Sequence, residues 1–311
     1  DSYNAEAEKQ SLLATFPRFR AIEEKHGSLI RGMLAARNAR APKPSNGGVP
    51  AASASASSKP APSKPAPTSV FMSMKQGMSE LVDTLVPELT GDCRLGISVK
   101  RVQPNGESYC LLMEDGSEMI AGRVVLAVPS FAAAKLIEAC APESARLLEK
   151  IRYVSTGTIS FAFRRDEIEH PMQGFGIVIP RSEGRNINAI TWSSTKFDHR
   201  APDEYVLLRC FFGGSKTPEM MAHDDEILTT IVRQELYSIM GISAEPVFHR
   251  IFRWFRSNPQ YDIGHLDLVA GIEAGLPSGL YVTGSPYRGV GIPDCVHQSQ
   301  QTAAKLASSA G

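Results

Sequence analysis

Several features that would assign a function at once are missing from this chain. Its five cysteines are widely spaced with no Cys-x-x-Cys pair, and its seven histidines show no spacing typical of a metal site. No Gly-x-Ser-x-Gly elbow, Walker loop or obvious acid–base pair of carboxylates occurs, which argues against a serine hydrolase and a P-loop enzyme. We therefore expect reduced thiols and no bound metal, and the catalytic residue stays unknown.

Excess charge and long apolar runs are also missing. The 33 basic and 33 acidic residues cancel, so no attraction to nucleic acid is expected. No apolar run reaches the roughly 18 residues of a membrane span, and Asp1 begins no signal peptide. These absences predict a cytoplasmic location. The length of 311 residues predicts about two domains.

What is present divides the chain into segments. Residues 1–40 are predicted to be helical, with apolar and basic side chains interleaved. In residues 41–69, 21 of 29 are Pro, Ala or Ser, a composition that predicts a disordered insert. Residues 70–150 have an α/β pattern, which returns in residues 261–311, and residues 151–260 alternate like a mostly antiparallel sheet. The order predicts an α/β (α+β) fold in which a sheet domain interrupts a Rossmann-like domain.

Particular elements are predicted within these segments. Residues 94–102 and 247–252 have the pattern of strands. Asp224 is expected to cap the start of a helix that Gly241 ends.

The stretch from residue 279 to 294, Gly-Leu-Tyr-Val-Thr-Gly-Ser-Pro-Tyr-Arg-Gly-Val-Gly-Ile-Pro-Asp, has the most informative pattern. It predicts a strand, a glycine-rich loop, and a helix that begins near Pro293. Free N–H groups at such a helix start suit an electron-rich ligand edge, as in a flavin site. The local pattern alone favours an ordinary strand-to-helix connection with turn glycines, because Gly-x-Gly is weak evidence for a ligand site.

Two further stretches have a structural and a functional interpretation. Residues 123–130, Arg-Val-Val-Leu-Ala-Val-Pro-Ser, are either a plain buried strand or a strand whose end faces a ligand crevice. Trp254, one of two tryptophans, is either buried core or a wall beside a cofactor.

Together these stretches resemble the bacterial FAD-dependent protoporphyrinogen and coproporphyrinogen III oxidases of heme biosynthesis. The strings that carry the resemblance are Gly-Ser-Leu-Ile-Arg-Gly-Met at 27–33, Val-Leu-Ala-Val-Pro at 125–129, Gln-Gly-Phe-Gly at 173–176, Pro-Gln-Tyr-x-x-Gly-His at 259–265 and Gly-Val-Gly-Ile-Pro-Asp at 289–294. The resemblance implies an amine-oxidase-like fold with a divided FAD domain, a sheet-based substrate domain and a small helical membrane-associated piece.

The resemblance also implies roles for particular residues. Val99 falls where the family contacts adenine, and Trp254 falls where it lines the cofactor. Phe131 and Ala132 fall near the porphyrinogen. The remaining cofactor residues lie in the glycine-rich stretch and are Gly284, Val290, Gly291 and Ile292.

The activity implied by the resemblance is FAD-dependent oxidation of coproporphyrinogen III to coproporphyrin III, or of protoporphyrinogen IX to protoporphyrin IX, in heme biosynthesis. O2 would be the electron acceptor and hydrogen peroxide the second product. The implied partners are the porphyrinogen and a ferrochelatase that takes over the product. The implied location is cytoplasmic, with peripheral contact at the inner face of the cell membrane.

One departure from the family concerns the missing Gly-x-Gly-x-x-Gly turn, which occurs nowhere in the 311 residues. The resemblance therefore covers the C-terminal two-thirds of the family, and we expect the chain alone to bind FAD weakly. Two alternatives stay open: a non-catalytic porphyrin-binding fragment, and another amine-oxidase-like flavoenzyme. The basic helices at residues 16–40 are equally consistent with a membrane contact and with an ordinary solvated face.

Overall fold

The computed structural model describes residues 5–40 and 72–308, so the insert expected at 41–69 lies outside the described residues. The chain forms two compact units. One comprises Pro17–Glu88, and the other comprises the residues up to Phe16 together with those from Leu89 onward. Residues 5–16 therefore belong to the larger unit.

The smaller unit consists of helices α2 (Pro17–His26), α3 (Leu29–Arg40) and α4 (Ser79–Leu85). A Cβ on Gly32 would collide with Ile22, so glycine allows α2 and α3 to pack closely. Ile30 and Met33 are 71% and 56% exposed. None of the helices in the described ranges is long and apolar enough to cross a membrane.

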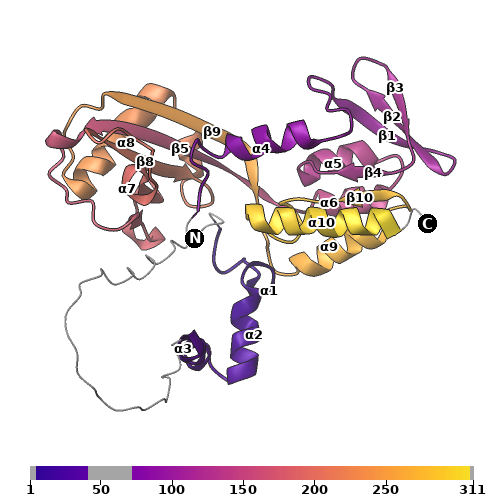
Figure 1. Ribbon diagram of the computed structural model, residues 1–311, viewed down its shortest axis with the longest axis horizontal. Coiled ribbons are helices and arrows are strands. Elements are labelled where there is room, and N and C mark those ends of the chain that lie inside the picture. Colours follow the sequence, from indigo (N-terminus) through magenta and orange to yellow (C-terminus); the bar gives the residue numbers. More distant parts are fainter. Residues whose placement is uncertain (1–4, 41–71, 309–311) are drawn as a thin grey trace, which may run out of the picture. The chain divides into compact units, whose positions relative to one another are not determined.

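The larger unit contains a five-stranded antiparallel sheet in the order β6-β7-β8-β5-β9. Figure 1 labels β5, β8 and β9 of this sheet. The sequence pattern predicted this sheet because its strands alternate apolar and polar side chains. β9 is longer than the strand predicted from residue 247 to 252. The strands are β5 (Tyr153–Arg164), β6 (Gly176–Val178), β7 (Ala189–Trp192), β8 (Tyr205–Gly213) and β9 (Phe248–Pro259).

Helix α8 (Asp225–Met240) covers one face of this sheet. Its side chains Leu228, Val232 and Leu236 pack into one buried cluster with Ile159 and Phe161 of β5. The predicted helix ends are confirmed. The Asp224 side chain accepts a hydrogen bond from the Ile227 N–H, and Gly241 adopts the left-handed conformation at φ +69°.

Removal of the cap of α8 should have a measurable cost. We expect Asp224→Ala to lower the free energy of unfolding by about 1 kcal/mol, because the Ile227 N–H loses its acceptor at 2.8 Å. Asp224→Asn keeps a capping oxygen and should retain most of the stability. Denaturant titration measures both variants, and an equal loss in the two would contradict the capping role.

The rest of the larger unit is an α/β part with a second core cluster. β1, β2 and β3 form an antiparallel sheet, and β4 pairs in parallel with β10. The predicted strand at 94–102 begins only at Val99, and Leu95 is 89% exposed. The elements are β1 (Val99–Asn105), β2 (Ser108–Met113), β3 (Glu118–Ala121), β4 (Val124–Leu126), β10 (Leu280–Val282), α1 (Leu12–Thr15), α5 (Ser130–Ile137), α6 (Pro142–Leu148), α9 (His265–Ala274) and α10 (Ile292–Ser308), with α7 (Ser193–Lys196) beside the larger sheet.

Candidate functional site

The carboxyl ends of β4 and β10 lie side by side. Leu126 pairs with Val282, and the Thr283 N–H donates to the Leu126 carbonyl oxygen at 3.1 Å. Beyond these ends, Ser130 and Thr283 each hold a buried hydroxyl that has no hydrogen-bond partner in the described structure. Ligands of parallel α/β sheets bind in the crevice outside the carboxyl ends of the strands. A bound polar group would satisfy these two hydroxyls.

The glycine-rich turn after β10 folds tightly onto Asp294. Gly289 has φ +145°, a conformation that L side chains rarely adopt, and its N–H donates to the Tyr261 hydroxyl at 2.7 Å. A Cβ on Gly289 would lie 2.5 Å from the Asp294 Cβ, and a Cβ on Gly291 would lie 2.9 Å from the Asp294 carboxylate. The glycines therefore make room for Asp294, a packing role that the sequence pattern did not predict.

The N–H groups of Val290, Gly291 and Ile292 donate to no other described group. The first helical bond of α10 runs from the Cys295 N–H to the Gly291 carbonyl oxygen at 2.9 Å. Ile292 is half-exposed, so this helix end is accessible. The N-terminus of a long helix also carries a partial positive charge. These three residues, which the sequence assigns to a flavin edge, thus have donors available for a ligand.

Tyr261 and His265 hold the glycine-rich turn in place through hydrogen bonds. Their buried rings stack with centroids 4.0 Å apart. The Tyr261 hydroxyl donates to the Ser285 carbonyl oxygen at 2.7 Å and accepts from the Gly289 N–H, and the His265 Nε2 lies 2.8 Å from the Tyr287 carbonyl oxygen. The sequence singled out these residues only as part of a family string. Their positioning role depends on contacts that join distant parts of the chain.

The buried imidazole of His265 should make stability depend on pH. Burial lowers the pKa of His265 below its usual 6.5, and the bond to the Tyr287 carbonyl only partly opposes this shift. Below about pH 6.5 the unfolded chain therefore binds a proton that the folded chain does not bind. We expect the free energy of unfolding to fall as the pH decreases from about 7 toward the lowered pKa, and to fall less in His265→Gln.

Denaturant titrations at several pH values measure this effect. The folded-state pKa values of Glu6 and Glu143 are lowered by their basic partners, so their stabilising contributions are lost at more acidic pH, below about 4.5. The two pH ranges are therefore separate. If the free energy of unfolding changes with pH near pH 6 as steeply in His265→Gln as in the unchanged protein, another group causes the pH dependence.

A second set of contacts surrounds Phe131 at the start of α5. The Phe131 and Tyr153 rings pack edge to face with centroids 5.2 Å apart, and the Arg256 guanidinium carbon lies 4.0 Å from the centroid of the Phe131 ring. The Tyr153 hydroxyl accepts from the Ser130 N–H at 2.9 Å, while burial raises the pKa of Tyr153. Arg256 has φ +47°, and its N–H donates to the Ser155 Oγ at 3.0 Å. An aromatic ring, a protonated phenol and a cation thus meet beside the end of β4.

The other residues predicted from the sequence lie on several different elements of the larger unit. Ala132 follows Phe131 and is half-buried. Trp254 is on β9, two residues before Arg256, where it is 45% exposed and stacks on Phe252 with centroids 5.8 Å apart. Val99 starts β1 in the three-stranded sheet and packs against the second core cluster. Gly284 begins the turn after β10 with φ +112°.

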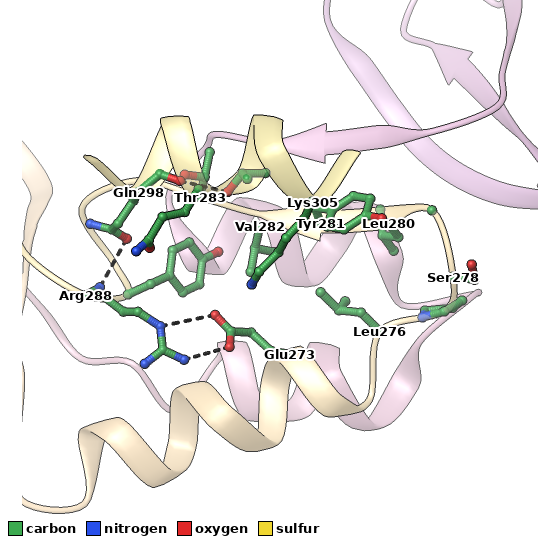
Figure 2. Close-up of a pocket in the computed structure, with 15 residues that line it drawn as sticks. Glu273, Leu276, Ser278, Leu280, Tyr281, Val282, Thr283, Arg288, Gln298 and Lys305 are labelled. Carbon is green, nitrogen blue, oxygen red and sulfur yellow. Dashed lines mark hydrogen bonds and ion pairs between the residues drawn. The ribbon is translucent and has the colours of Figure 1, made fainter. Parts of the chain in front are cut away.

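A cavity of about 290 Å³ lies between β10, α9 and α10, as Figure 2 shows. Glu273 contacts the Arg288 guanidinium at 2.6 and 3.3 Å, and the Arg288 N–H donates to the Gln298 side chain at 3.3 Å. The Thr283 and Tyr287 side chains also line the cavity, and their buried hydroxyls have no partner in the described structure. This polar lining suits a polar ligand group better than an aromatic ring.

The chain belongs to the family of flavin-containing amine oxidoreductases, whose model matches residues 1–307. It is 29% identical over 306 residues to a coproporphyrinogen III oxidase of Bacillus subtilis, covering 96% of this chain and 60% of that protein. It is 28% identical over 311 residues to a coproporphyrinogen III oxidase of Staphylococcus aureus, covering 98% of this chain and 63% of that protein. The flavoprotein family expected from the sequence is confirmed.

A solved structure supports the same fold. A provisionally named protoporphyrinogen oxidase from Exiguobacterium sp. 255-15 aligns with a TM-score of 0.75 and 28% identity, covering 96% of this chain and 59% of that one. The amine-oxidase-like fold predicted from the sequence is therefore confirmed. The chain spans about 60% of the length of these relatives.

Proposed function

We propose that this chain supplies the flavin edge and the porphyrinogen-binding surface of an FAD-dependent porphyrinogen oxidase. The observation that carries the proposal is the accessible set of N–H donors at Val290, Gly291 and Ile292, in a turn that Tyr261 holds in place. The names of the two bacterial relatives support the substrate class.

The residues present fit a flavin. Donors at residues 290–292 would bind the electron-rich edge of the ring, and each favourable helix-terminus interaction is worth roughly 0.3–2 kcal/mol. Trp254 would form an aromatic wall, and Val99 would lie at the adenine end. Gly284 and the partnerless Thr283 hydroxyl would contact the polar middle of the cofactor. When bound, FAD would take two electrons from the substrate at each step and pass them to O2, giving hydrogen peroxide.

The chain's own residues would bind and orient the porphyrinogen. Phe131 and Ala132 present an apolar surface, and Arg256 places a cation against the Phe131 ring for a substrate carboxylate. Tyr153 keeps its proton because its pKa is raised, so its hydroxyl remains neutral while it fixes the Ser130 N–H. The proposed reaction removes six hydrogens from coproporphyrinogen III, or from protoporphyrinogen IX, in three two-electron steps.

Peripheral membrane contact is proposed for the helical unit. Ile30 and Met33 are exposed on α3, and Arg31 stands between them in the sequence. An anionic membrane would attract such a surface and bring a poorly soluble porphyrinogen close. A cytoplasmic enzyme at the inner membrane face, handing its product to a ferrochelatase, fits this arrangement. Sedimentation with anionic liposomes should weaken in Ile30→Ser and Arg31→Glu, and unchanged sedimentation of both variants would contradict the membrane contact.

The activity test uses the purified protein with freshly reduced coproporphyrinogen III and a saturating excess of FAD, because the chain is expected to bind the cofactor weakly. We expect fluorescent coproporphyrin to appear in the presence of O2, together with hydrogen peroxide. Porphyrin binding without turnover would instead support the non-catalytic alternative. Peroxide formation from an amine such as putrescine, without porphyrinogen oxidation, would support another amine-oxidase-like flavoenzyme. Either result would overturn the proposal.

A further inference from the structure

The face of the five-stranded sheet opposite α8, the open face, carries exposed side chains such as Phe252 and Trp254, while Thr158 and Ser160 at its centre are buried. Thr158 pairs with Phe211 on β8 and with Phe252 on β9, and Ser160 pairs with Arg209 and Arg250 on the same two strands. Because alternate residues of a strand point to opposite faces, these side chains share one face, while Ile159 and Phe161 point into the core beneath α8. The positions on the open face of β8, β5 and β9 include Thr156, Thr158, Ser160, Ala162, Leu207, Arg209, Phe211, Phe248, Arg250, Phe252 and Trp254.

These eleven positions hold no acidic residue. Arg209 and Arg250 are exposed and make no ion pair with any described carboxylate. Arg253, on the opposite face of β9, differs because it contacts Asp225 and donates to the His223 carbonyl oxygen at 2.8 Å. The two open-face arginines flank Ser160, so their Cα atoms are about 10 Å apart, two strand spacings.

Aromatic side chains lie close to Arg209 and Arg250, and a groove lies on the same face of the sheet. The Arg250 guanidinium lies 5.0 Å from the centroid of the Phe252 ring, which stacks on Trp254. A groove of about 430 Å³ lies beside Arg209, with Thr158, Phe211 and Trp254 in its lining and Arg250 outside it. A volume of a few hundred Å³ suits a ligand of drug size with a large apolar surface.

We propose that Arg209 and Arg250 bind carboxylates of the porphyrinogen side chains and make the site selective for a substrate with four carboxylates over one with two. The inference rests on the proposed function and extends it. The aromatic side chains would contact the macrocycle while the two guanidinium groups, spaced across one strand, would each bind a carboxylate at its periphery. A coproporphyrinogen, with four propionates, has a carboxylate for each of Arg209, Arg250 and Arg256, whereas a protoporphyrinogen, with two propionates, cannot pair with all three.

Equilibrium titration with product porphyrins tests this selectivity without turnover. The purified protein is titrated with coproporphyrin III, which has four carboxylates, and with deuteroporphyrin IX, which has two, while porphyrin fluorescence is followed. We expect Arg209→Ala and Arg250→Ala each to weaken coproporphyrin binding about tenfold, the loss of one charged hydrogen bond, and to change deuteroporphyrin binding less. Arg209→Lys and Arg250→Lys should recover part of the affinity, since lysine keeps the charge but not the bidentate geometry.

Arg233→Ala is the matched control, because Arg233 lies on α8 beyond the opposite face and pairs with Glu245. It should leave both affinities unchanged. Equal loss of affinity for the two porphyrins, no loss of affinity at all, or the same loss in Arg233→Ala would overturn the selectivity without contradicting the proposed porphyrinogen oxidation. Failure of the wild-type protein to bind either porphyrin would overturn both the selectivity and the proposed function.

Discussion

Replacing Gly289 with alanine is expected to remove most of the affinity for FAD and to lower the stability of the protein. The alanine Cβ would lie 2.5 Å from the Asp294 Cβ, at a φ of +145° that L residues rarely adopt. Relief of this collision must move the turn and with it the N–H groups of residues 290–292. Backbone strain of this kind costs roughly 1–3 kcal/mol, which corresponds to at least about a fivefold loss of affinity if it falls on the bound state.

Gly122→Ala is the matched control for this change. Gly122 has no heavy atom within 4 Å of an added Cβ, and its φ lies outside the left-handed region. A titration with FAD, followed by flavin fluorescence, and a denaturant titration should separate the two variants. If Gly289→Ala binds FAD as tightly as the unchanged protein does, the turn does not form the flavin site.

Tyr261→Phe is expected to have the next largest effect. The change removes one hydroxyl at a residue that is 1% exposed, and this hydroxyl joins Ser285 to Gly289 through bonds of 2.7 Å each. The buried Gly289 N–H then has no acceptor, which costs about 1–3 kcal/mol. Both the free energy of unfolding and the affinity for FAD should fall, because the hydroxyl fixes the turn that carries the proposed flavin donors.

The control for Tyr261→Phe is Tyr237→Phe on α8. Tyr237 is 63% exposed, so loss of its hydroxyl should change neither the free energy of unfolding nor the free energy of FAD binding by more than about 0.5 kcal/mol. A Tyr261→Phe protein with lowered stability but unchanged FAD affinity would limit Tyr261 to a structural role.

Local patterns were sufficient to predict the parts of the fold that local interactions determine. Helix α8 was placed correctly because Asp224 and Gly241 carry the capping chemistry at its two ends. The strand, turn and helix at residues 279–294 were predicted for the same reason, since Gly289 and Pro293 restrict the backbone where they stand.

The site depends on contacts that no local pattern contains. Tyr261 meets Gly289 across 28 positions, and Phe131 meets Arg256 only because β9 extends along β5 as far as Pro259. The shared face of Arg209 and Arg250 follows from sheet register, which the alternation of either strand alone does not fix. β3 was missed because it has only four residues, and no helix was predicted at α9 although its buried residues Val269 and Ile272 lie at helical spacing.

The central claim is that a flavin edge binds at the start of α10, and amide-resolved NMR during a titration with FAD tests it most directly. The account predicts that the amide resonances of Val290, Gly291 and Ile292 shift together as FAD binds, while that of Gly122 stays in place. Shifts confined to the cavity beside Tyr281 and Gln298, with residues 290–292 unaffected, would contradict it.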